Sequence, residues 1–71
     1  MTTNRERASH CRRVIEAYAA DDLATNLIDL LCDAMHWCDQ NGENFHLLLA
    51  NACRHYINEL NDQQTDERKL P

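Results

Sequence analysis

The fold is decided by residues 23–60, in which two apolar segments flank one Asn-Gly pair: LATNLIDLLCDAMHWCDQ-NGEN-FHLLLANACRHYINEL. In the first segment, apolar side chains recur three and four residues apart, as on one face of a helix, at Leu23, Leu27, Leu30, Ala34 and Cys38. The second segment repeats this spacing at Phe45, Leu48, Leu49, Ala52, Cys53, Tyr56, Ile57 and Leu60. Gly42 suits the left-handed position that follows a helix. The pattern therefore predicts helices over about 23–41 and 44–61, joined as an antiparallel αα-hairpin.

A third helix is predicted before the hairpin, over about 4–19. Thr3 or Thr2 can cap it, and Glu6 stands three residues after Thr3, as in a capping box. Its apolar stripe consists of Ala8, Cys11, Ile15 and Tyr18. Asp21 and Asp22 then offer a cap for the next helix. We expect an all-α, three-helix domain over 1–61, in which the helix at 4–19 packs across the hairpin, followed by a flexible polar tail over 62–71.

The length and composition indicate one small domain. The chain has 71 residues, of which 44% are hydrophobic. A chain of this size buries only about 60% of its unfolded surface, and many such chains are stabilised by a second subunit. The apolar residues of segment 23–41 extend beyond a single stripe, which is typical of a helix that touches two neighbours. The sequence therefore predicts a possible homodimer through helix 23–41.

Charge is distributed unevenly along the chain. Residues 21–40 hold five aspartates and no basic residue, whereas residues 1–20 carry a net charge of +2, and the whole chain nets −5. We expect the arginines of the first helix to meet aspartates of the second. An acidic chain is repelled by phosphates, so nucleic acid is a disfavoured partner. A small DNA-binding regulator stays an alternative, although the third helix offers only Arg54 as a permanent cation.

The sequence predicts a cytoplasmic protein. Residues 1–13 are polar and rich in arginine, with no apolar stretch suited to a signal peptide. No segment approaches the roughly 18 apolar residues of a membrane span. We therefore expect the four cysteines to stay free thiols in a reducing compartment.

One polar cluster bears on metal binding. Asp29, Cys32, Asp33 and His36 fall along one side of the second predicted helix. Cys32 and His36 can bind one zinc ion, but no second Cys/His pair of suitable spacing completes a site of four ligands. A zinc-binding domain that uses Cys32 and His36 is therefore an alternative reading. No catalytic residue or cofactor is predicted, and three short helices leave little concave volume for an enzyme's substrate.

Four side chains are candidates for a partner contact. Trp37 and Tyr56 are of the types that anchor interfaces. Asp29 and Asp33 form an acidic surface that resembles a row of phosphates.

The centre of the chain also resembles a known group of proteins. Met35-His36-Trp37-Cys38-Asp39, then Asn41-Gly42 and Phe45, is similar to the centre of small helical proteins of bacterial plasmids, prophages and integrative elements. The similarity covers roughly residues 23–60, and that group has no assigned activity. The resemblance implies a bacterial, accessory-genome setting. We therefore expect a non-enzymatic protein-interaction module or small regulator whose partner is a protein.

Overall fold

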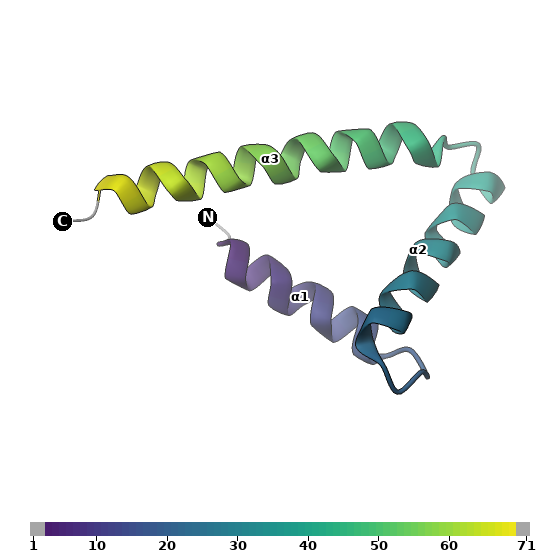
Figure 1. Ribbon diagram of the computed structural model, residues 1–71. Helices are drawn as coiled ribbons and strands as arrows, with labels where there is room; N and C mark the ends of the chain where they lie inside the picture. The colour runs from purple at the N-terminus through teal and green to yellow at the C-terminus, as the bar shows by residue number, and fades with distance from the viewer. Residues whose placement is uncertain (1–2, 70–71) are drawn as a thin grey trace.

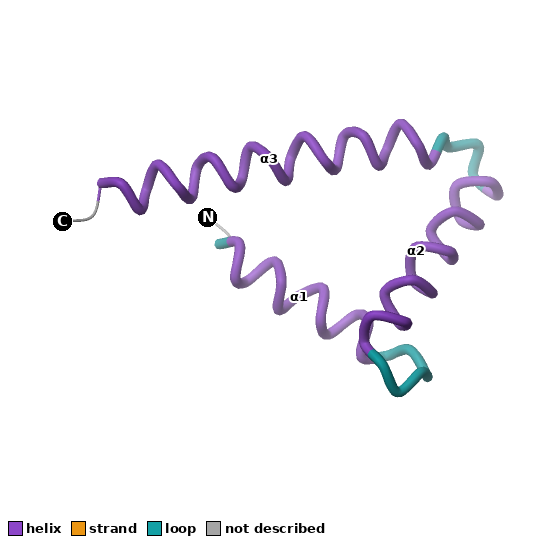
Figure 2. Tube along the Cα trace, in the orientation of Figure 1, coloured by secondary structure: helices purple, strands orange, loops and turns teal. Residues whose placement is uncertain are grey.

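The computed structural model describes the backbone of residues 3–69 and the side chains of residues 3–62. It contains three helices, α1 (Asn4–Glu16), α2 (Leu23–Gln40) and α3 (Phe45–Lys69), and no strand within the described residues. The three helices form an open triangle (Figure 1), and loops turn the chain at two of its corners (Figure 2). The predicted all-α, three-helix fold is thus confirmed.

Helix α1 begins where its capping residue predicts. Thr3 is the N-cap, and its hydroxyl oxygen accepts a hydrogen bond from the Glu6 backbone N–H at 3.1 Å. The Thr3 hydroxyl also donates to the Glu6 carboxylate at 3.2 Å. The helix ends at Glu16, three residues earlier than expected, and the backbone N–H groups of Ala17 and Tyr18 close a final turn.

The connection from α1 to α2 is organised by Asn26, which is 1% exposed. Its amide oxygen accepts a hydrogen bond from the Ala20 N–H at 3.0 Å. Its amide nitrogen donates to the carbonyl oxygens of Ala20 at 3.2 Å and Tyr18 at 3.4 Å. One side chain of α2 therefore holds the preceding loop by three hydrogen bonds to its backbone.

Helix α2 is bounded by the predicted signals at both ends. The Asp22 carboxylate accepts hydrogen bonds from the backbone N–H groups of Ala24 and Thr25. At the other end, Gly42 adopts a φ of 69°, and the Glu43 N–H donates to the Cys38 carbonyl at 2.9 Å. This bond spans six residues and matches a Schellman motif with Gly42 at its left-handed position.

Helix α3 starts with the expected cap and ends later than expected. The Asn44 side chain accepts a hydrogen bond from the Leu47 N–H at 3.2 Å. The predicted end near residue 61 is wrong, because the helix runs to Lys69. Residues 62–69 of the predicted tail thus continue α3, and residues 70–71 lie outside the described part of the chain.

The antiparallel packing of the hairpin is not confirmed. From the corner at Gly42, α2 and α3 diverge instead of lying side by side (Figure 1). Helix α1 does not lie in a groove between them; it closes the triangle by reaching α3. The Asn4 side-chain amide donates to the Glu59 carbonyl at 3.3 Å, and Arg7 forms an ion pair with Glu59 at 3.4 Å.

This open arrangement leaves almost no core within one chain. Within residues 3–62, the only buried side chains are Cys38 (3% exposed) and Asn26. The Cα radius of gyration is 15.1 Å, whereas a compact domain of this length has about 11 Å. The predicted apolar face of α2 is therefore buried or half-buried except at Leu27, whereas that of α3 is exposed except at the half-buried Phe45.

Candidate protein-interaction surface

Helix α2 carries two apolar stripes with different surroundings. The first is buried or half-buried at Leu23, Asn26, Leu30, Ala34 and Cys38. The second lies beside it and is exposed at Leu27 (39%), Ile28 (64%), Leu31 (42%) and Met35 (45%). Ala24, Ile28, Leu31, Met35 and Cys38 alternate spacings of four and three, which is the repeat of a helix that packs against another helix.

Helix α3 adds a second exposed apolar stripe. Its members are large side chains that recur at helical spacing, namely Leu48 (41%), Leu49 (43%), Tyr56 (61%), Ile57 (54%) and Leu60 (38%). Cys53 lies among them, four residues from both Leu49 and Ile57, and is exposed. Leu47, at 64% exposure, lies on the other side of the helix.

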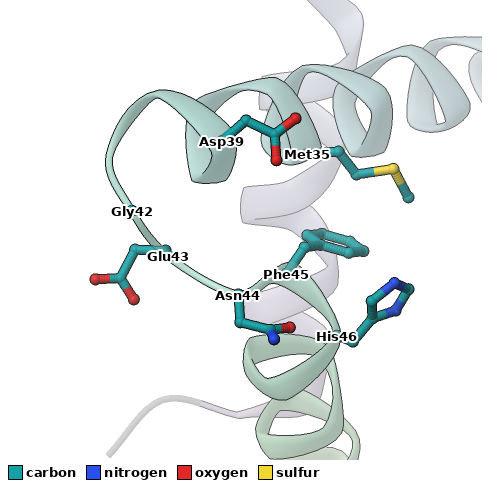
Figure 3. Close-up of a pocket in the computed structure, with 7 residues that line it drawn as sticks. All are labelled: Met35, Asp39, Gly42, Glu43, Asn44, Phe45 and His46. Atoms are coloured by element: carbon teal, nitrogen blue, oxygen red, sulfur yellow. The ribbon is translucent and has the colours of Figure 1, made fainter.

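The two stripes meet at the α2–α3 corner. A shallow hollow of about 400 Å³ is lined there by Met35, Asp39, Gly42, Glu43, Asn44, Phe45 and His46. Met35, Phe45 and His46 project toward the same side of this corner (Figure 3). Met35 continues the stripe of α2, and Phe45 begins that of α3. We call the nine residues that form the two stripes the open apolar face: Leu27, Ile28, Leu31, Met35, Leu48, Leu49, Tyr56, Ile57 and Leu60.

The predicted aromatic anchors are placed differently with respect to this face. Tyr56 belongs to it. Trp37 is also exposed, at 58%, but it follows Met35 by two residues, which turns it about 160° away around the helix. Neither ring is buried within the single chain, and only Tyr56 lies on the open apolar face.

The acidic residues of α2 are not paired with the arginines of α1. The ion pairs found within residues 3–62 are Arg7–Glu59 and Arg12–Glu16. Asp33 instead accepts a hydrogen bond from the Tyr18 hydroxyl at 2.6 Å. The expected pairing of α1 arginines with α2 aspartates is therefore wrong, because Arg7 pairs with Glu59 of α3, and α1 meets α2 near their shared corner (Figure 1).

Two ionisable groups are perturbed near that corner. The hydrogen bond to Asp33 raises the pKa of Tyr18, and partial burial and the negative charges of Asp33 and Asp29 add to the effect. Hydrogen bonds from the Thr25 hydroxyl, and then from the backbone N–H groups of Thr25 and Ala24, lower the pKa of Asp22. The Asp22 contacts cap the start of α2, and the Tyr18–Asp33 hydrogen bond ties the preceding loop to the middle of that helix.

The metal hypothesis gains no support from one chain. Asp29, Asp33 and His36 lie on α2 away from the open apolar face, whereas Cys32 borders it, four residues after Ile28 and three before Met35. Within the described residues, no three His, Cys, Asp or Glu side chains come close enough together to hold a metal ion. A zinc ion bound by Cys32 and His36 would need its remaining ligands from another molecule.

Asn26 is the residue that sequence reasoning missed. It interrupts the apolar stripe between Leu23 and Leu30, four residues after the cap Asp22. An amide in a predicted apolar stripe must find hydrogen-bond partners when it is buried. A polar residue in this apolar stripe was therefore the sequence signal that Asn26 bonds to the preceding loop.

No protein-family model, curated protein or solved structure was found to match this chain. In the part of the chain that the structure describes, no helix is long and apolar enough to cross a membrane.

Proposed function

We propose that this chain is a small, non-enzymatic protein-interaction module or regulator, and that its open apolar face is the surface that binds a protein. The observation that carries the proposal is the exposure of the nine large side chains on that face, each between 38% and 64%. Contiguous exposed apolar surface is typical of a site covered by another molecule. Two features of this face are common in protein interfaces: an exposed tyrosine, Tyr56, and the heptad-like stripe of α2.

Several finer expectations belong to the same proposal. We propose that one form of the interaction is a homodimer through helix 23–41. We also propose that the protein is cytoplasmic and belongs to a bacterial accessory genome. The similarity of residues 23–60 to proteins of mobile elements supports the setting, and the polar residues 1–13 support the location. The hollow at the α2–α3 corner is shallow, which suits contact with a protein surface more than enclosure of a small substrate.

Trp37, Asp29 and Asp33 are proposed as secondary contacts. They lie outside the open apolar face, so a partner that touches them must extend around α2. Their polar surroundings suit the rim of an interface more than its centre.

Affinity purification from bacterial cells tests the proposal. The tagged chain, the variant Leu49→Glu and the control Leu47→Glu are expressed at equal levels. The two leucines belong to the same helix, but only Leu49 lies on the open apolar face. We expect a second protein to co-purify in stoichiometric amount with the unchanged chain and with Leu47→Glu. An untagged copy of this chain counts as that protein. We expect Leu49→Glu to lose it. Equal recovery of the protein with all three chains, or no bound protein at all, contradicts the proposal.

A further inference from the structure

We infer that the occupant of the open apolar face is a second copy of this chain, and that both α2 and α3 contribute to the contact. This inference rests on the proposed function and names its partner. It differs from a dimer formed by α2 alone, because the longer part of the exposed face belongs to α3.

The first argument is the amount of surface that one chain leaves uncovered. The accessible area is 6306 Å² for a chain of 8.3 kDa, whereas a compact monomer of this mass exposes about 4,600 Å². The excess of about 1,700 Å² per chain lies within the range of about 1,000–2,500 Å² that each subunit of an obligate homodimer buries. Half of that excess would match the ~800 Å² per partner of a standard interface.

The second argument is the composition of the uncovered surface. The open apolar face combines four large side chains of α2 with five of α3. Met35 and Phe45 line the hollow between its two parts, together with the acidic residues Asp39 and Glu43. Obligate interfaces between like subunits resemble a domain core divided in two. A two-fold axis lets each face cover the other, since the same patch is used on both subunits.

The cysteines provide an internal test of the arrangement. In the single chain, Cys53 and Cys11 are both exposed. Cys53 lies in the middle of the α3 stripe, whereas Cys11 lies on α1, which contributes no residue to the open apolar face. A second copy seated on α2 and α3 covers Cys53 and leaves Cys11 accessible. A dimer through α2 alone leaves both thiols accessible.

The experiment combines sedimentation equilibrium with thiol modification of the purified, reduced, full-length protein. We expect a mass twice that of the chain, and iodoacetamide alkylation at least about tenfold slower at Cys53 than at Cys11, as protection by a mostly associated population requires. Dilution should raise the rate at Cys53 selectively. The variants Leu31→Glu and Leu49→Glu should sediment as monomers, and Leu47→Glu should remain dimeric.

A monomer at every concentration, or a dimer in which Cys53 reacts as fast as Cys11, overturns the inference. The wild-type alkylation pattern decides the matter even if the glutamate variants fail to fold. If the purified chain is monomeric but a different protein is retained in a Leu49-dependent manner, the proposed function stands and the second copy is excluded. If nothing is retained in cells either, both fail together.

Discussion

Replacing Asn26 with alanine removes the side chain that fixes the α1–α2 connection. Three hydrogen bonds are lost, from the Ala20 N–H and to the Ala20 and Tyr18 carbonyls, at 3.0, 3.2 and 3.4 Å. Each such bond contributes about 0.5–1.5 kcal/mol net. Because the loop backbone is only partly buried and water can replace some of the bonds, we expect a loss of ~2–3 kcal/mol in the free energy of unfolding.

Urea titration followed by circular dichroism at one fixed protein concentration measures this loss. Asn58→Ala is the matched control, since Asn58 is exposed on α3 and its truncation should change stability by less than about 0.5 kcal/mol. A loss below about 0.5 kcal/mol for Asn26→Ala would refute the claim that the Asn26 hydrogen bonds stabilise the α1–α2 connection, because truncation of a surface asparagine has an effect of that size. The comparison must use equal concentrations, since association also contributes to stability.

Three further predictions test separate contacts. Leu49→Ala should lower the free energy of unfolding by ~2–5 kcal/mol in a urea titration, as for a covered leucine; a loss below about 1 kcal/mol would show that Leu49 stays exposed. Tyr56→Phe leaves Tyr18 as the one tyrosine, so its ionisation can be followed by ultraviolet absorbance. In that background, Asp33→Asn should lower the pKa of Tyr18, because the hydrogen bond to Asp33 is the largest cause of the raised pKa. An unchanged titration curve would contradict that hydrogen bond. Asp22 contributes stability that is present above its unfolded pKa and lost as pH falls through its lowered folded pKa. The thermal midpoint of Asp22→Asn should therefore fall less steeply with acid than that of the unchanged chain. Parallel pH profiles for the two chains would show that Asp22 does not cap α2.

The local features of this fold follow from short sequence signals. Thr3, Asp22 and Asn44 cap the three helices where their side chains predict. Gly42 takes the left-handed conformation that its place after α2 requires. These signals act over a few residues, and the chemistry of a cap or a helix end needs no knowledge of the rest of the chain.

The packing of the helices does not follow from the same signals. The spacing of Leu48, Leu49 and Leu60 identifies an apolar face, but it does not say which molecule covers that face. A hairpin and an open corner use the same Asn-Gly connection, and only contacts between distant residues decide between them. Here Arg7 and Asn4 tie α1 to Glu59 of α3, and α2 and α3 diverge.

The candidate site was therefore only partly predictable. Tyr56 was identified from its residue type, and it lies on the exposed face. Trp37, chosen by the same reasoning, lies off it, because two residues along a helix point to nearly opposite sides. Asn26 was missed because its role depends on the path of the loop that precedes it.

The most direct test of an apolar face shared between two copies is the dependence of the unfolding midpoint on protein concentration. Thermal unfolding is followed by circular dichroism over about two decades of concentration, since folding coupled to association makes the midpoint depend on concentration. We predict that the midpoint rises steadily with concentration for the unchanged chain and for Leu47→Glu. A midpoint that stays constant over that range for a chain sedimenting as a monomer would contradict the account, because the open apolar face would then be stable without a second copy.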